Sequence, residues 1–222
     1  MSRITALTEH PRRRGRYRLE LDGESKTVVD AELVLELRLK IGLEVDAVLA
    51  AQIDHGAARL AAFDKGMAAL AIRARSEREL ARWLAQKGHA VEHVTPAIER
   101  LSALGFLNDA EFARSFARSR AVGRGMPGRR IQAELVRRGV SLALAVAAIA
   151  DVMEDEGVDE SALVEAAAAK KLRSLAQFEP EVRRRRLYGF LARKGFAADR
   201  IHEILRRLTR NGRAADSSPD AP

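Results

Sequence analysis

The stretch of this sequence with the form of a cofactor-binding motif is Gly123-Arg124-Gly125-Met126-Pro127-Gly128. It matches the G-x-G-x-x-G fingerprint, which binds a dinucleotide only where a strand precedes it and a helix follows it. Here an arginine-rich helical pattern precedes it, and Pro127 suits the start of a helix. We therefore predict a link between two helices and no nucleotide cofactor. The chain also has no P-loop signature.

Two histidines, His89 and His93, have the four-residue spacing that can bind a metal ion on one face of a helix. The metalloprotease pattern needs glutamate directly after the first histidine, and this chain has Ala90 there. No third ligand is evident nearby, so we expect two partly exposed histidines at a helix start and no metal site. We find no paired carboxylates and no Ser-His-Asp set. The sequence therefore predicts a protein that is not an enzyme, with no catalytic residues and no cofactor.

The elements that surround these residues form an internal repeat. Two core positions are followed each time by a cation and a glycine, and these glycines lie 51 and 56 residues apart. A cation followed by glycine is typical of a helix end, because the helix dipole is negative there and glycine adopts the left-handed cap. We therefore assign these cations a structural role. The three segments are Leu80, Leu84 and Lys87-Gly88; Ile131, Leu135 and Arg138-Gly139; and Leu187, Leu191 and Lys194-Gly195.

Each segment has a helical pattern on both sides, so each repeat contains three helices. The earlier helices are expected at 67–75, 111–122 and 161–178. The later ones carry a buried stripe at i, i+4 and i+7, at Val94, Ile98 and Leu101; Ala145, Ile149 and Val152; and Ile201, Leu205 and Leu208. Repeats of this kind bury their apolar faces against their neighbours. The pattern predicts a mainly α fold, an elongated array of three tandem three-helix repeats.

A different pattern precedes the repeats. Tyr17, Leu19 and Leu21 alternate, and Asp22-Gly23 is a hairpin signal, so we predict a small antiparallel β-sheet over residues 3–30 and no strand after it. Asp30 is expected to cap a helix that ends at Gly42. A second helix is expected from Asp46 to a break at Asp64-Lys65-Gly66. The predicted domains are 1–64, the sheet with helices; 65–108, 109–156 and 157–210, the repeats; and 211–222, a disordered tail.

The composition narrows the function classes. The chain has 222 residues, a net charge of +8 and no cysteine, which excludes disulfides and thiolate chemistry. A pI near 10.4 favours a polyanionic partner, although a generally arginine-rich proteome would have the same effect. The first 15 residues lack the apolar core of a signal peptide, and no stretch approaches a membrane span. We predict a soluble, cytoplasmic protein that does not contact membranes.

Four stretches are specific in their order and spacing: Ser76-Glu77-Arg78-Glu79-Leu80 with Lys87-Gly88; Gly105-Phe106-Leu107-Asn108-Asp109-Ala110-Glu111-Phe112-Ala113; Ile131-Gln132-Ala133-Glu134-Leu135 with Arg138-Gly139-Val140; and Arg193-Lys194-Gly195-Phe196. Together they resemble the RecX family over residues 65–208, and the preceding sheet also fits. One departure is the alanine-rich stretch 165–171, where an aromatic helix is expected.

The resemblance implies a regulator that binds the RecA recombinase or its nucleoprotein filament, and single- and double-stranded DNA more weakly. It would limit filament growth, ATP hydrolysis and strand exchange, without a cofactor. The expected setting is DNA repair by homologous recombination and the SOS response, and we expect a monomer.

Seven arginines are the candidate binding residues, which we name the arginine stripe. Five lie two residues from a core position on the second helix of a repeat, and two lie opposite Phe112 and Phe116, so all are expected to face away from the core. Arginine suits phosphate or carboxylate because its planar fork makes two hydrogen bonds at once. The alternative is a solvated face that keeps an alanine-rich helix soluble. The stripe comprises Arg78, Arg114, Arg118, Arg129, Arg137, Arg185 and Arg193.

Two other functions stay open from the residues alone. One is a general DNA-binding architectural protein without a dedicated protein partner, and the other is a scaffold whose basic face meets an acidic protein. Phosphate contacts release counterions and give binding a steep dependence on salt, whereas a mixed protein interface gives a shallower one.

Overall fold

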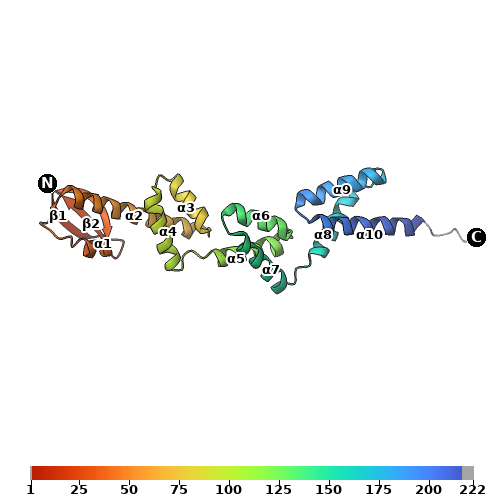
Figure 1. Cartoon of the computed structure of the whole chain (residues 1–222), viewed down its shortest axis with the longest axis horizontal. Helices are drawn as coiled ribbons and strands as arrows, with labels where there is room; N and C mark the ends of the chain where they lie inside the picture. Colours follow the sequence, from red (N-terminus) through yellow and green to blue (C-terminus); the bar gives the residue numbers. More distant parts are fainter. Residues whose placement is uncertain (1, 217–222) are drawn as a thin grey trace, which may run out of the picture. The chain divides into compact units, whose positions relative to one another are not determined.

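The computed structural model describes the backbone of residues 2–216 and the side chains of residues 2–207. The chain is mainly helical, with a small sheet at the N-terminal end (Figure 1). It forms two compact units, Met1–Asn108 and Asp109–Pro222. The finer division into five segments stays a prediction.

The sheet has the antiparallel strand order β3-β2-β1-β4 within the described residues. Its strands are β1 (Ser2–Glu9), β2 (Arg16–Leu21), β3 (Glu24–Asp30) and β4 (Glu44–Val45). The predicted hairpin turn is confirmed, since Asp22 and Gly23 have φ values of 51° and 85°, as a type I′ turn requires. The Arg3 backbone N–H donates to Asp22 Oδ1 at 2.9 Å, and this bond lowers the pKa of Asp22. Strand β4 was missed.

The segment that follows β3 explains the missed strand. Asp30 caps helix α1 (Ala31–Glu36) as expected, because its side chain accepts from the backbone N–H of Leu33. The expectation that α1 continues to Gly42 is wrong. The Gly42 N–H donates to the Ile4 carbonyl at 2.8 Å, and the Ile4 N–H donates to the Leu43 carbonyl at 3.0 Å. The backbone N–H of Gly42 and the carbonyl of Leu43 therefore bond to strand β1, so they are not available for the hydrogen bonds of a longer helix.

Helix α2 (Ala47–Ile72) begins after the predicted cap Asp46, which accepts from the Leu49 N–H at 2.7 Å. The predicted break at Asp64-Lys65-Gly66 is wrong, because α2 runs through it. A Cβ on Gly66 would lie 2.8 Å from Cδ1 of Leu101, so this glycine permits close helix packing. Ile53 belongs to the core under the sheet, whereas Phe63 and Ala69 belong to the next core. Helix α2 therefore contributes side chains to two hydrophobic cores, and its C-terminal half is the first helix of repeat 1.

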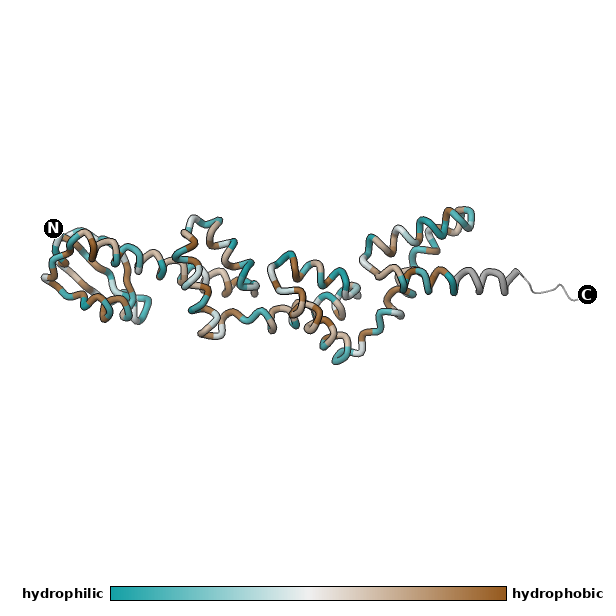
Figure 2. The backbone as a smooth tube through the Cα atoms, viewed as in Figure 1, coloured by the Kyte–Doolittle hydropathy of each residue, from teal (hydrophilic) through white to brown (hydrophobic). Residues whose placement is uncertain are grey.

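The three predicted repeats are confirmed as three-helix groups, each with its own core. Side chains at the shared core positions, such as Leu84, Leu135 and Leu191, are fully buried. Hydrophobic and hydrophilic residues alternate along the helices in Figure 2. The helices are α3 (Glu77–Gln86) and α4 (Val91–Ala103) with α2 in repeat 1; α5 (Asp109–Arg124), α6 (Gly128–Arg138) and α7 (Leu142–Asp155) in repeat 2; and α8 (Glu160–Arg173), α9 (Pro180–Lys194) and α10 (Ala198–Asp216) in repeat 3.

The chain ends differently from the prediction. Helix α10 continues to Asp216, past Asn211, where we expected the disordered tail to begin. Arginine and alanine dominate 213–215, and both are strong helix formers. The Leu208 side chain and residues 217–222 lie outside the described parts of the chain.

Contacts between repeats 2 and 3 include two that involve the first turn of α6. The Gly128 N–H at the start of α6 donates to Oε1 of Glu160 in α8 at 2.7 Å. Gly195, which ends α9 in the left-handed conformation with φ 97°, lies against Arg130 of α6. The glycine caps at Gly139 and Gly195 are confirmed, and Gly139 has φ 99°.

Alanine substitutions at two of the repeat glycines are expected to separate backbone strain from packing. Gly88 has φ 90° and a Cβ there meets nothing within 4 Å, whereas a Cβ at Gly195 lies 2.8 Å from Cβ of Arg130. We expect Gly88→Ala to lower the free energy of unfolding by about 1–2 kcal/mol, the cost of left-handed backbone. Gly195→Ala should lower it by about 1–3 kcal/mol more, through overpacking. Urea unfolding measures both, and equal losses would mean that α6 yields freely at this contact.

Candidate basic interface

Five residues of the arginine stripe lie on the second helices of the repeats. Arg78, Arg129 and Arg185 are exposed, and each precedes a buried residue by two positions. Arg137 and Arg193 are also exposed, near the ends of α6 and α9. The outward orientation predicted from the repeat register is therefore confirmed for these five residues, and their binding role stays a prediction.

The other two stripe residues, on α5, are engaged within repeat 2. Arg114 pairs with Asp155, and Nε of Arg118 donates to Oε1 of Glu156 at 2.6 Å. Both arginines are about half exposed, so each pair contributes little stability. Their charge, however, is offset by the carboxylates at the end of α7, which makes them weaker candidates for a partner's anion.

Four arginines of the stripe, which we name the unpaired set, have no carboxylate among the described residues that offsets their positive charge. Within the described part of the chain, the guanidinium groups of this unpaired set have no ion-pair partner. An exposed cation without a partner keeps its full charge for another molecule. The unpaired set comprises Arg78, Arg129, Arg185 and Arg193.

Arg129 has an additional feature, because it lies in the first turn of α6. That turn carries no acidic residue, and the N-cap Pro127 offers no side-chain hydrogen bond. A cation near a helix N-terminus is disfavoured by about 0.3–1 kcal/mol. The positive charge of neighbouring Arg130 is offset by Glu134, since Nε of Arg130 lies 3.6 Å from Oε1 of Glu134. Arg129 has no such ion pair among the described residues. The Glu160 carboxylate already occupies the Gly128 N–H at the start of α6, so what an external anion could still bind there is the unpaired guanidinium group of Arg129.

An arginine run, Arg183–Arg186, lies in α9, and of its residues only Arg185 was predicted from the sequence. Arg186 stacks on Phe178, with Cζ 3.9 Å from the ring centre, and Arg183 is half-buried. Arg184 and Arg185 are exposed side by side. The run is visible in the sequence, but the repeat register selects only Arg185, so Arg184 was overlooked.

Each repeat also holds an aromatic ring with two cations close to its ring centre, an arrangement that we name a cation clamp. In repeat 1, Trp83 has Arg75 at 5.0 Å and Lys87 at 5.7 Å from its ring centre. Burial lowers the pKa of Arg75, and the charge of Arg73 lowers it further, yet an arginine stays protonated. The other two clamps are Arg120 and Arg138 on Phe116, and Lys171 and Lys194 on Phe190. One cation of each clamp is the predicted helix-end cation, which supports its structural role.

The glycine-rich stretch 123–128 links α5 to α6, as predicted, and does not follow a strand. The N–H of Gly128, which a dinucleotide phosphate would need, already donates to Glu160. The geometry therefore disfavours a nucleotide at this link.

His89 precedes α4, whose N-cap is Ala90, and His93 lies inside the helix, so these histidines do not share one helical face. Both are partly buried. No helix among the described residues combines the length and the apolar character needed to cross a membrane.

Fold and surface together define a class: a helical-repeat protein with a small N-terminal sheet and outward-facing arginines recurring from repeat to repeat. Residues 62–101, 108–149 and 159–205 match the first, second and third three-helix domains of RecX. The chain belongs to the RecX family of regulatory proteins.

Three comparisons illustrate this membership. The regulatory protein RecX of Pelodictyon phaeoclathratiforme is 37% identical over 68% of this chain and 89% of its own length. The regulatory protein RecX of Halorhodospira halophila is 40% identical over 67% of this chain and 88% of its own length. A crystal structure of a regulatory protein RecX has the same fold, with a TM-score of 0.75 at 22% identity, over 93% of this chain and 100% of that one.

Proposed function

We propose that this protein binds the RecA recombinase, and above all its filament on DNA, and inhibits filament growth, ATP hydrolysis and strand exchange. The family supports a regulatory role without catalysis. The observation that carries the proposal is the unpaired set, in which Arg78, Arg129 and Arg185 recur at one position of three repeats.

A recurring cation suits a partner that itself repeats. Adjacent repeats present equivalent guanidinium groups, and a filament presents equivalent phosphates or carboxylates along its length. Arginine binds either group with two parallel hydrogen bonds. Single- and double-stranded DNA alone would offer only part of this surface, so we expect weaker binding there. Cytoplasmic location and a role in DNA repair, recombination and the SOS response follow from this partner and belong to the proposal, as does a monomeric state.

The test is DNA-dependent ATP hydrolysis by RecA, measured with this protein at substoichiometric amounts. A regulator that blocks filament growth acts on many RecA subunits at once, so one copy per many subunits should lower the hydrolysis rate. A decrease only at equimolar amounts or above, or no decrease, would contradict the proposal.

A general DNA-binding role is the second candidate, favoured by the net charge of +8. DNA binding by exposed arginines alone would weaken by orders of magnitude between low and physiological salt. RecA-filament binding through mixed contacts should show a shallower dependence. Comparing the salt slopes for bare DNA and for the filament separates the two functions.

A further inference from the structure

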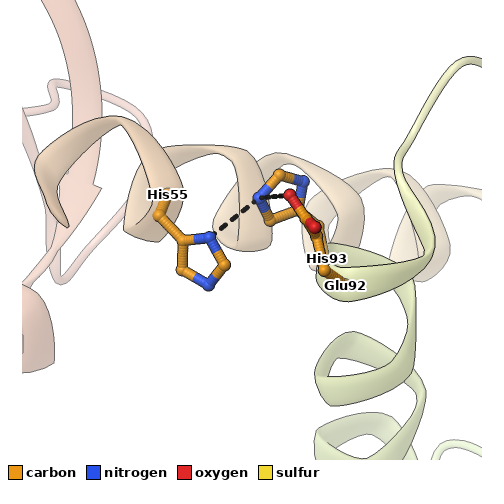
Figure 3. Close-up of side chains that lie close together, drawn as sticks. All are labelled: His55, Glu92 and His93. Atoms are coloured by element: carbon orange, nitrogen blue, oxygen red, sulfur yellow. Dashed lines mark hydrogen bonds and ion pairs between the residues drawn. The ribbon is translucent and has the colours of Figure 1, made fainter. Parts of the chain in front are cut away.

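Two histidines and a glutamate from separate helices of unit Met1–Asn108 converge on one point (Figure 3). His55 extends from α2, and Glu92 and His93 lie in the first turn of α4. Nε2 of His93 lies 3.1 Å from Nδ1 of His55 and 3.7 Å from Oε1 of Glu92. One donor atom from each of the three residues falls within 4.8 Å of the others.

The spacing fits a transition-metal ion. Zinc–nitrogen bonds are about 2.0–2.1 Å long, so two imidazoles on one ion have nitrogens roughly 2.9–3.4 Å apart at angles between octahedral and tetrahedral. The observed separation of 3.1 Å falls in this range. Two imidazoles and one carboxylate are also a ligand set that zinc accepts, with water as the fourth ligand. Magnesium and calcium prefer oxygen ligands, so the two imidazoles favour zinc and its neighbours.

The surroundings allow access while holding the ligands. The side chain of His93 is only 15% exposed and that of Glu92 is 69% exposed. His55 is exposed and also lines a groove of about 640 Å³ between α1 and α2. Solvent therefore reaches the cluster from the His55 and Glu92 side, while His93 is positioned by helix packing.

We propose that His55, Glu92 and His93 bind one divalent transition-metal ion, with zinc as the preferred ion. The ion would join α2, which serves two cores, to the start of α4, which completes repeat 1. Because this contact links residues 38 positions apart, a bound ion would stabilise the folded unit. The site is separate from the arginine stripe and independent of the proposed function. The site was not predicted from the sequence because the spacing suggests His89 as the neighbour of His93, whereas the fold places His55 beside His93.

Titration of the untagged full chain with zinc chloride tests the proposal. We expect one ion per chain by calorimetry and a rise in Tm with zinc. His55→Ala and His93→Ala should each weaken binding by more than about tenfold, since even an outer-shell partner of a metal ligand contributes 10–100-fold. Glu92→Gln should weaken it less than either histidine variant, because the exposed carboxylate is the least constrained ligand.

The matched control is His89→Ala, which removes a histidine of the same region that is not in the cluster. It should bind zinc as the parent does, and circular dichroism checks that all variants are folded. Cobalt(II) gives a second readout, because its visible absorption should be the same for the parent and the His89→Ala variant and should need a higher cobalt concentration for the His55→Ala and His93→Ala variants. Absence of binding to the parent, or unchanged binding to a folded His55→Ala, His93→Ala double variant, would overturn the proposal and leave a histidine–histidine hydrogen bond.

Discussion

A variant that lacks four exposed arginines of α6 and α9 is expected to fold and to lose inhibition of RecA. Each side chain points away from the core, where a surface change usually costs within about 0.5 kcal/mol. If each arginine contributes about 1 kcal/mol to binding, their joint loss weakens it by nearly three orders of magnitude, about 1,000-fold. The readouts are circular dichroism and DNA-stimulated ATP hydrolysis by RecA. The four changes are Arg129→Ala, Arg137→Ala, Arg185→Ala and Arg193→Ala.

The control for this variant removes the same net charge from another part of the chain. Four exposed cations of the sheet region serve, and their replacement should leave inhibition nearly unchanged. Equal loss in both variants would indicate a general charge effect and favour the DNA-binding alternative. A folded variant without the four stripe arginines that inhibits as well as the parent would show that they are only a solvated face. The control changes are Arg12→Ala, Arg14→Ala, Arg18→Ala and Lys40→Ala.

A second control uses the ion pairs of α5. Arg114→Ala with Arg118→Ala removes two stripe residues whose charge Asp155 and Glu156 already offset. This pair of changes should leave inhibition close to that of the parent. Strong loss would mean that the partner displaces these carboxylates.

Leu135→Ala is expected to lower the free energy of unfolding by about 2–5 kcal/mol. The Leu135 side chain is 0% exposed and packs with Ile131 and Ala145 in the core of repeat 2. Truncation removes its apolar contacts and leaves a cavity that the short helices fill only partly. Urea unfolding measures the effect. A loss below about 1 kcal/mol, under the usual range, would show that the core relaxes around the shorter side chain.

The adjacent Val136 is the matched control. It lies on the same helix and is 44% exposed, so Val136→Ala should change stability by no more than about 0.5 kcal/mol. Alanine is the strongest helix former, so helix propensity alone would not make either change costly. A cost for Val136→Ala similar to that for Leu135→Ala would therefore contradict burial as the cause of the Leu135→Ala loss.

The repeats were predictable from the sequence because their signals are local. The second helix of each repeat has core residues four positions apart and ends at a cation followed by glycine. A few turns of sequence are therefore enough to predict both its buried face and its C-terminal end. The hairpin at Asp22-Gly23 and the caps Asp30 and Asp46 are equally local. The outward direction of Arg129 and Arg185 followed from the same register.

Tertiary contacts decided the rest. The sequence around Gly66 suggests a helix break, yet α2 continues through it. Leu101 packs against Gly66 in the space that a side chain would occupy. Strand β4 forms because the backbone N–H and carbonyl groups at the edge of β1 pair with residues 42–45. No local sequence pattern predicts this pairing. Spacing along one helix likewise cannot show that Arg114 meets Asp155 from another helix.

The sequence by itself thus determined the class of fold, the repeat register and which arginines face outward, since these depend on periodicities of a few residues. Only the tertiary structure decided which arginines stay unpaired, how far α2 extends and that His55 meets His93. Those features depend on contacts between residues tens of positions apart, and the positions of such partners in space are set by the packing of whole helices.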